Sequence, residues 1–231
     1  MDSDLNGRPT ARAAAAVFAG HLHIDAAPDG LGRTVIARQS FRAPFHIGKG
    51  YWDGHALQVR VVNPTAGILA GDALELDVAV ASGAALLVNA PAATRVFMMK
   101  GGAASCRQRF RVAARGWLEY APEPLFPHGG AEFEQSTQIE VDADGECCFT
   151  EALAPGRAGR GETWAWRRLR LGLDLIVGGV PLLRERLDAS GPEMGRQAAF
   201  HAMPEAWFAT VLLVSPALAD ENPLWPRIRS L

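Results

Sequence analysis

The chain has 231 residues, of which 48% are hydrophobic and 21% charged, and its formal net charge at pH 7 is −2. This length suits one large all-β domain or two small domains, and the weak net charge favours neither nucleic acid nor an anionic membrane as a partner. No apolar run approaches the roughly 18 to 20 residues of a membrane-spanning helix. Three cysteines that cannot all pair, and an N-terminus without the basic start and apolar core of a secretory signal, predict a reduced, cytoplasmic setting.

The first half of the chain is predicted to be a tail followed by strands. Residues 1–15 are polar and then alanine-rich, which predicts a flexible tail, and we expect residues 16–231 to form a single domain because nothing marks a boundary. In the first alternating run, His21 and His23 would share a face, where two imidazoles can chelate a metal or simply lie on an edge strand. Alternation of apolar and polar residues predicts the first four strands at residues 16–24, 34–41, 56–62 and 74–80.

Residues 63–72 form a shaped loop between the third and fourth expected strands. Pro64 fixes its own φ, whereas Gly67 and Gly71 allow backbone angles that other residues avoid. Asp72 follows the second glycine and begins the next strand. The loop therefore sets an acidic group at a defined position.

The strand pattern continues through the middle of the chain. Residues 105–113 place three arginines on one face, which suits a solvated sheet face or, alternatively, a partner-binding stripe. Asp144-Gly145 predicts a hairpin, and the adjacent Cys147 and Cys148 would point to opposite faces of the strand after it. The three arginines are Arg107, Arg109 and Arg111.

The C-terminal third contains a hairpin signal at Gly178-Gly179. Residues 189–206 are predicted to be irregular, apart from a short helical turn near residues 196–200. Strands at intervals of roughly 8 to 12 residues, with no long helical periodicity, predict a mainly β fold of antiparallel and mixed strands. The last expected strands cover residues 163–177, 180–187 and 206–214.

Catalytic signatures are absent, so we do not expect an enzyme. The sequence has no Gly-x-Ser-x-Gly, His-Glu-x-x-His, Cys-x-x-Cys or phosphate-loop motif. Several acids lie beside turns, and each one alone would most simply cap a turn or form a surface ion pair. Together with a few histidines they suit weak, passing contacts with a divalent ion, since nickel also accepts imidazole. These acids are Asp72, Glu119, Glu123 and Glu162.

Five segments resemble, in the right order, motifs of the urease accessory proteins called UreD, or UreH in some organisms. The hallmark loop of that family reads roughly Asn-Pro-(Thr/Pro)-Gly-Gly-x-x-Gly-Gly-Asp, and another of its motifs reads Gly-Arg-x-x-x-Gly-Glu. The matching segments are residues 63–72, 90–97, 117–124 and 156–162 and the hairpin around Gly178-Gly179.

The resemblance implies a scaffold of urease maturation with a helix-like stack of β-strands and little helix near the C-terminus. UreD proteins bind apo-urease and a UreF partner, which recruits the GTPase UreG, and a water-filled passage through UreD is a proposed route for nickel. The resemblance therefore implies nickel in transit and no tightly bound cofactor. By position, the candidates for transient nickel contacts are Asp72, Glu119, Glu123, Glu162 and His128. The residues expected to hold loops in shape or to bind partners are Asn63, Thr65, Gly67, Gly71, Arg95 and Arg157.

Three features depart from the family pattern. Ala66 and Ala70 replace glycines of the hallmark loop, so a positive φ there would be strained. Glu123 stands where the family usually has glutamine, which adds a charge. The chain ends at Leu231, whereas family members typically continue for several dozen residues.

Two other functions stay open on the sequence. A stand-alone β-sheet module that binds a ligand such as a carbohydrate is favoured by Trp164 and Trp166, which would share one face of a strand. A metal-dependent hydrolase would use His21, His23 and a carboxylate, although no third ligand occurs at a fixed spacing.

Overall fold

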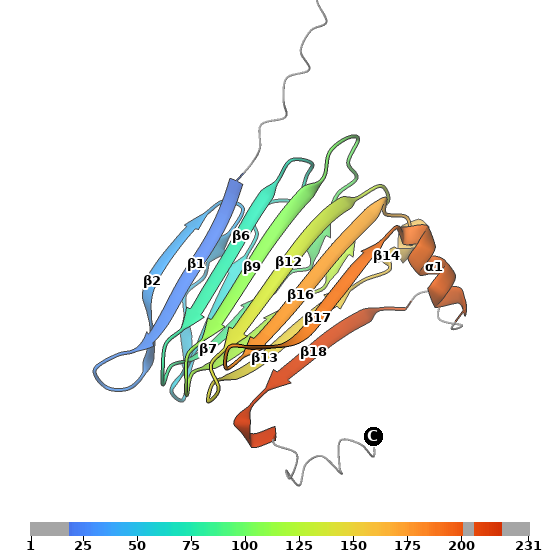
Figure 1. Ribbon diagram of the computed structural model, residues 1–231. Helices are drawn as coiled ribbons and strands as arrows, with labels where there is room; N and C mark the ends of the chain where they lie inside the picture. Colours follow the sequence, from blue (N-terminus) through green and yellow to red (C-terminus); the bar gives the residue numbers. More distant parts are fainter. Residues whose placement is uncertain (1–18, 201–205, 219–231) are drawn as a thin grey trace, which may run out of the picture.

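The computed structural model describes residues 19–200 and 206–218, so the expected tail, residues 1–15, lies outside the described part. Within the described residues, two large sheets face each other and their strands stack side by side along the molecule (Figure 1). We call the seven-stranded sheet the front sheet and the nine-stranded sheet the back sheet. The mainly β, helix-like stack predicted from the sequence is confirmed.

The front sheet has a parallel centre with an antiparallel strand at each edge. Among the described residues its strands, in spatial order, are β17 (Val180–Ala189), β16 (Arg168–Val177), β12 (Glu132–Val141), β9 (Ala104–Val112), β6 (Ala73–Val80), β1 (Ala19–Pro28) and β2 (Thr34–Arg42).

The long central strands of the back sheet pair in parallel. Within the same described ranges its strands, in spatial order, are β3 (His46–Ile47), β5 (Ala56–Val62), β7 (Ala85–Ala90), β10 (Trp117–Pro122), β13 (Glu146–Leu153), β11 (Leu125–Pro127) and β8 (Thr94–Val96), with β4 (Tyr51–Asp53) beside β5 and β18 (Phe208–Val214) beside β13. The short strands β3 and β4 and the longer strand β18 pair antiparallel with their neighbours at the edges. The remaining elements are the β14 (Gly156–Arg157) and β15 (Glu162–Thr163) ribbon, the 3-10 turns η1 (Ala158–Arg160) and η2 (Pro216–Leu218), and α1 (Gly191–Phe200).

Successive long strands alternate between the two sheets. The chain passes from β5 in the back sheet to β6 in the front sheet, and the alternation continues through β7, β9, β10, β12, β13 and β16. Each pair of crossings adds one parallel neighbour to each sheet, which is the arrangement of a β-solenoid.

This alternation makes one turn prediction wrong and leaves another correct. Asp144-Gly145 lies in the turn between β12 and β13, but these strands belong to different sheets and do not pair, so the predicted hairpin is absent there. Gly178-Gly179 does close an antiparallel hairpin between β16 and β17. Both turns have the residues that a tight reversal needs, and only the partner of the following strand differs.

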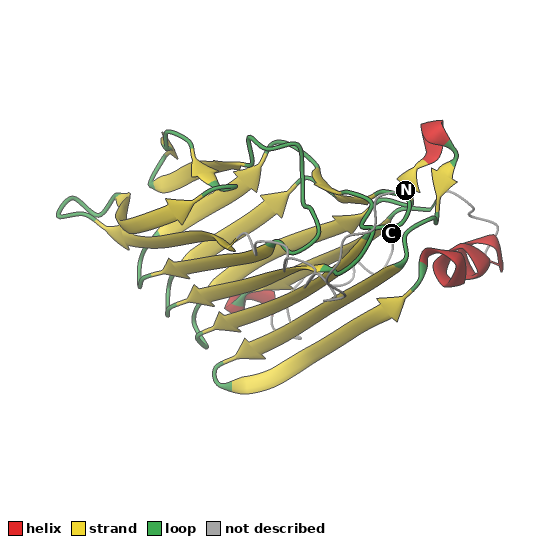
Figure 2. Ribbon diagram, turned by 90° about the horizontal axis from the view of Figure 1, so that it is seen from above, coloured by secondary structure: helices red, strands yellow, loops and turns green. Residues whose placement is uncertain are grey.

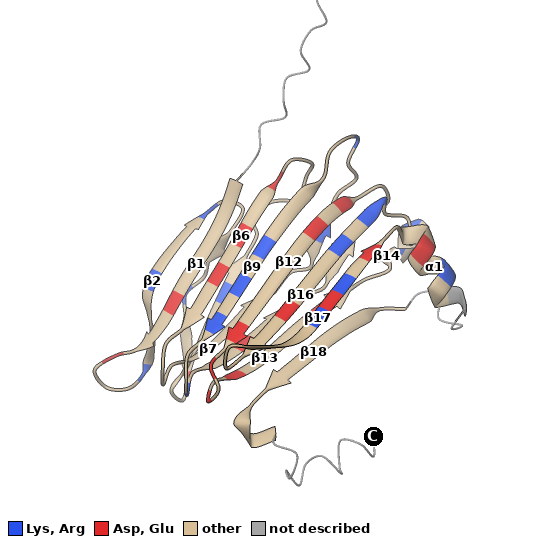
Figure 3. Ribbon diagram, in the orientation of Figure 1, with Lys and Arg blue, Asp and Glu red and all other residues tan. Residues whose placement is uncertain are grey.

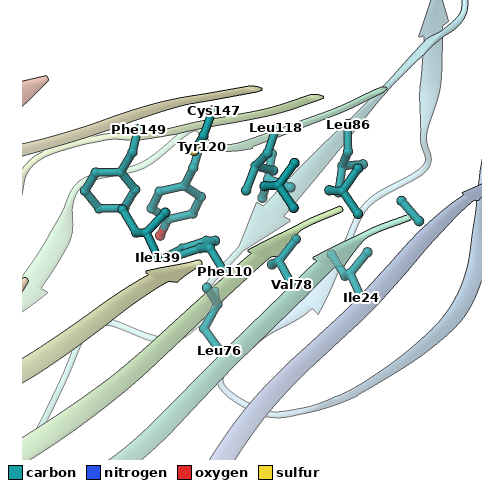
Figure 4. Packing of buried hydrophobic residues seen from close by; sticks show 14 of the residues in the cluster. Ile24, Leu76, Val78, Leu86, Phe110, Leu118, Tyr120, Ile139, Cys147 and Phe149 are labelled. Carbon is teal, nitrogen blue, oxygen red and sulfur yellow. The ribbon is translucent and has the colours of Figure 1, made fainter. Parts of the chain in front are cut away.

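The core fills the space between the sheets with alternate side chains from both. Ile24, Val78 and Phe110 of the front sheet meet Leu118 and Phe149 of the back sheet (Figure 4). The rings of Phe110, Tyr120 and Phe149 contact one another with centroids 4.6, 5.4 and 5.6 Å apart. Apolar burial of this kind is the main favourable contribution to folding.

The two adjacent cysteines lie on opposite faces of β13, as predicted. Cys147 is buried in the core, where desolvation raises the pKa of its thiol to about 12. Cys148 is half-buried on the outer face of the back sheet.

Charged residues occur along the strands of the front sheet, as Figure 3 shows. Arg107, Arg109 and Arg111 of β9 point outward, and each forms an ion pair with an acid on a neighbouring strand. The acids are Glu75 at 3.4 Å, Glu140 at 3.2 Å and Asp77 at 2.6 Å, respectively. These pairs favour the solvated-face interpretation of the arginine row.

A helix lies at one end of the stack, beside the end of β17 (Figures 1 and 2). α1 begins at Gly191, earlier than the expected turn at residues 196–200, because Ser190 and Glu193 form a capping box. Glu193 Oε2 accepts a hydrogen bond from the Ser190 backbone N–H at 2.6 Å, and Ser190 Oγ accepts one from the Glu193 N–H at 3.4 Å. No described helix is long and apolar enough to cross a membrane.

The two tryptophans proposed as a ligand-binding face are buried. Trp164 and Trp166 are 8% and 1% exposed and share an apolar cluster with Met194 and Ala198 of α1. The strand expected over residues 163–177 is interrupted, because Trp164 adopts a φ of +56° and β16 begins only at Arg168. The prediction of an exposed aromatic pair, which favoured a carbohydrate-binding module, is therefore wrong.

Candidate functional site

A cavity of about 220 Å³ lies between the two sheets. Leu76, Gln108 and Gln135 line it from the front sheet, and Tyr120 and Glu151 line it from the back sheet. The loop that follows β5 and the strand β8 also contribute to the lining, and they bring four of the residues singled out by sequence to the cavity. These four are Asn63, Thr65, Gly67 and Arg95, and Glu123 joins them from the segment after β10.

Polar side chains form a connected network in this largely apolar interior. Gln135 Nε2 donates a hydrogen bond to Glu151 Oε2 at 2.9 Å, and Thr137 Oγ1 donates one to Gln108 Oε1 at 3.1 Å. Gln108 Nε2 reaches Gln135 Oε1 at 3.5 Å. Burial raises the pKa of Glu151, the carboxylate of Glu185 raises it further, and the bond from Gln135 opposes both effects.

Glu151 was not among the sequence candidates. It occupies an inward position of β13, the same face as Cys147, Phe149 and Leu153, where alternation predicts an apolar residue. An acid in an otherwise apolar inward row is the signal that could have identified it.

A second cavity, of about 410 Å³, continues from Glu151 toward the edge of the stack. It lies between β16 and β17 of the front sheet and β13 and β18 of the back sheet, and Glu185 and Thr210 line it together with Glu151. Glu151 therefore borders both cavities.

The loop at residues 63–72 joins β5 to β6 as predicted and is closed by its own side chains. Asn63 Oδ1 accepts hydrogen bonds from the Thr65 backbone N–H at 3.0 Å and from Thr65 Oγ1 at 2.6 Å. Asp72 Oδ2 accepts one from the Leu69 N–H at 2.8 Å. Asp72 therefore shapes the loop exit and is absent from the described lining of the cavity.

The two alanines of this loop fit without backbone strain. Gly67 and Gly71 have φ values of +148° and +88°, whereas neither Ala66 nor Ala70 adopts a positive φ. The two positions where the family has glycine thus do not need it in this chain, and the expected strain is absent.

Glu162 and His128 lie together outside the inter-sheet cavity. The Arg157 guanidinium donates to both Glu162 oxygens, at 2.5 and 2.9 Å, and the Gly129 N–H donates to Oε2 at 2.9 Å. These bonds hold the pKa of Glu162 below its usual value. His128 is 6% exposed, and the centroid of its ring lies 4.7 Å from that of Phe97. Burial is the main cause that lowers the pKa of His128, and the positive charge of Arg157 lowers it further.

Glu119 and Glu123 lie at separate places along the segment that includes β10. Glu119 faces outward, in register with Cys148 of β13, and its charge adds to the burial that raises the pKa of that thiol. Glu123 is exposed and lines the cavity near Arg95. The five sequence candidates for nickel contacts are thus spread over several places and do not form one site.

Histidines of the first strand do share a face, but they do not gather a ligand set. His21 and His23 are both half-buried on β1, and His23 Nε2 lies 3.0 Å from Asp25 Oδ2. Among the described residues, no three His, Cys, Asp or Glu side chains group closely enough to hold a metal ion.

Comparison with known proteins identifies the family. A family model described as UreD urease accessory protein matches residues 19–231, almost the whole chain. The chain belongs to the UreD family. This membership gives the UreD chain a role in urease maturation.

Individual UreD proteins align over most of this chain. A urease accessory protein UreD of Opitutus terrae is 50% identical over 89% of this chain and 76% of its own length. The UreD of Alkalilimnicola ehrlichii is 30% identical over 90% of this chain and 71% of its own length. That of Acetivibrio thermocellus is 29% identical over 67% of this chain, and the alignment covers 60% of the relative.

Proposed function

We propose that this UreD protein is a non-catalytic, cytoplasmic scaffold that binds apo-urease and a UreF-type partner, and through that partner a UreG-type GTPase. In this proposal the space between the two sheets is the route by which nickel reaches urease, and no cofactor is held tightly. Family membership supports the scaffold role, and Glu151 is the observation that supports the route.

Glu151 suits a passing divalent ion because of where its carboxylate lies. It borders both inter-sheet cavities, and its neighbours there offer amide and hydroxyl oxygens. An ionised carboxylate inside a protein is costly unless a cation or hydrogen bonds compensate, and Gln135 provides one hydrogen bond. A nickel ion would add the missing positive charge, and oxygen ligands alone hold nickel loosely enough for release.

The sequence candidates take different parts in this proposal. Glu123 is placed to meet the ion at the cavity. Asp72, Glu119, Glu162 and His128 remain candidate transient contacts outside the lining of the first cavity. The remaining candidates, Asn63, Thr65, Gly67, Gly71, Arg95 and Arg157, shape the loops.

The test is co-expression of the chain with apo-urease and its accessory proteins, followed by measurement of nickel per urease active site. Glu151→Gln removes the charge at nearly constant shape, and Glu134→Gln makes the same change at an exposed position on the outer face of β12. We expect Glu151→Gln to lower the nickel content while apo-urease and the UreF-type partner still co-purify, and Glu134→Gln to leave both unchanged.

Two results would count against the proposal in different ways. Full nickel content with both Glu151→Gln and Glu151→Leu would rule out the route past Glu151. A folded chain that co-purifies with neither apo-urease nor the UreF-type partner would rule out the scaffold itself.

A further inference from the structure

Among the residues that the structure describes, the edges of the two large sheets carry some protection, apart from the edge formed by β18. The front-sheet edge strand β17 carries Arg184, Glu185, Arg186 and Asp188, and a proline at its second position. The opposite edge, β2, carries Arg38 and Arg42, and the edge strands β3 and β4 of the back sheet have only two and three residues. Charges, proline and shortness are the usual means by which proteins prevent edge-to-edge pairing.

β18 has none of these protections. It is a seven-residue strand that pairs with β13 and, within the described residues, with no other strand. No charged residue occurs from residue 206 to residue 218. Val211 and Leu213 are 66% and 57% exposed, and Trp207 just before the strand is 56% exposed. An uncharged edge with exposed apolar side chains is a template for a further strand.

The register with β13 fixes which side chains of β18 face outward. Thr210 lies opposite Glu151, whose side chain points between the sheets, so Thr210 points inward as well. Ala209, Val211 and Leu213 therefore lie on the outer face, since successive strand residues alternate.

We propose that the free edge of β18 pairs antiparallel with β18 of a second copy of this chain, across a two-fold axis at Val211. This register places Val211 opposite Val211 of the other copy, Ala209 opposite Leu213, Thr210 opposite Leu212 and Phe208 opposite Val214, so Phe208 and the leucines each face a smaller residue. Side chains directly opposite each other across an antiparallel pair are the ones that decide its stability. No like charges meet, because the segment has none.

A second copy fits this edge better than a charged partner does. The same seven residues are complementary to themselves, as a two-fold interface requires. A partner recognised by charge would find no counter-charge here. A single strand pairing buries less than the roughly 800 Å² per partner of a standard interface, so we expect a dimer that dissociates on dilution.

The test is sedimentation velocity of the full chain over a wide range of concentrations, with a charge placed on the proposed axis. We expect the wild type to approach twice the chain mass of 24.7 kDa at high concentration, and Val211→Lys to remain at the single-chain mass. Mixing Val211→Lys with Val211→Glu should restore the dimer, because opposite charges would then meet at the axis. Leu182→Lys is the matched control, with a 62% exposed leucine on the edge strand of the front sheet, and should dimerise as the wild type does.

Several outcomes would overturn the proposal. These are a wild type that stays monomeric at all concentrations, a Val211→Lys variant with unchanged circular dichroism that still dimerises, and a Leu182→Lys variant that loses the dimer. A monomeric wild type whose capture of the UreF-type partner is abolished by Val211→Lys would assign the edge to that partner instead. None of these results bears on the nickel content measured with Glu151→Gln, so the two proposals fail separately.

Discussion

Replacement of Gly67 by alanine should open the junction between the loop at residues 63–72 and β8. A Cβ atom at Gly67 would lie 2.6 Å from the Arg95 carbonyl oxygen and 2.7 Å from Cε2 of Phe97. That carbonyl accepts a hydrogen bond from the Ile68 N–H at 2.8 Å, and the Phe97 N–H donates to the Ile68 carbonyl at 3.0 Å. Because the nearest atom belongs to the backbone, the methyl group can be accommodated only by moving the two segments apart.

The magnitude has two parts. A residue with a side chain at the positive φ of this position costs about 1–2 kcal/mol. Overpacking against a fixed neighbour costs about 1–3 kcal/mol more, so Gly67→Ala should lower the free energy of unfolding by about 2–5 kcal/mol. For a chain of this size each kcal/mol lowers the Tm by about 2–4 °C, which gives a fall of about 4–20 °C.

Gly71→Ala is the matched control. Gly71 has a φ of +88°, but nothing lies within 4 Å of its Cβ position, so only the backbone strain of about 1–2 kcal/mol applies. Thermal unfolding followed by circular dichroism compares the two variants. Equal falls in Tm would refute the argument that the contact with Arg95 adds to the strain. Ala66→Gly should not stabilise the protein, because Ala66 has no positive φ to relieve.

Three further changes have expected outcomes. Glu151→Gln should raise the Tm at pH 8 and have little effect at pH 4. Burial raises the pKa of this carboxyl above its usual 4.5, so the stability that the wild type has below pH 4.5 is lost as the pH rises through the folded-state pKa. An equal change in Tm at pH 4 and pH 8 would contradict this. Glu162→Gln should have the opposite dependence, since the pKa of Glu162 is lowered: its contribution is present above pH 4.5 and disappears on acidification, so the Tm difference from wild type should shrink as the pH falls. Ser190→Ala should lower the free energy of unfolding by about 1 kcal/mol through loss of the capping box. Its control, Ser136→Ala at an exposed position of β12, should leave the Tm within about 1 °C of wild type, the usual size of surface effects. Similar falls in Tm for the two variants would mean that the cap does not contribute.

Strands and their buried faces were predictable from sequence because alternation is a local property. The alternation at residues 56–62 and 74–80 gave β5 and β6 with nearly the observed bounds. The partner of each strand was not predictable in the same way. In the solenoid a strand pairs with the one in the next coil, so the turn at Asp144-Gly145 leads across to the other sheet instead of back along the same one.

The site was predictable only in part, for the same reason. The hallmark loop brings Asn63, Thr65 and Gly67 to the cavity, whereas Asp72, the acid that the loop was expected to set in position, accepts a hydrogen bond from Leu69 at the loop exit. Glu151 interrupts the apolar inward row of β13, which is visible in the sequence, but its surroundings come from Gln135 and Glu185 on other strands, which the sequence does not bring together. The prediction that Trp164 and Trp166 share an exposed strand face was wrong because the positive φ of Trp164 interrupts the strand that alternation predicted.

The alternation between sheets also determines how the protein can form during synthesis. β1 can pair with its parallel neighbour β6 only after β6 has emerged from the ribosome. In the same way β6 needs β9, β9 needs β12, and β12 needs β16. Each coil that has folded presents a ready edge to the next, so the nascent chain can gain structure one coil at a time from its N-terminal end. A chain released between β10 and β13 would contain Phe110 and Tyr120 without Phe149, and its last coil would offer an aromatic surface to chaperones.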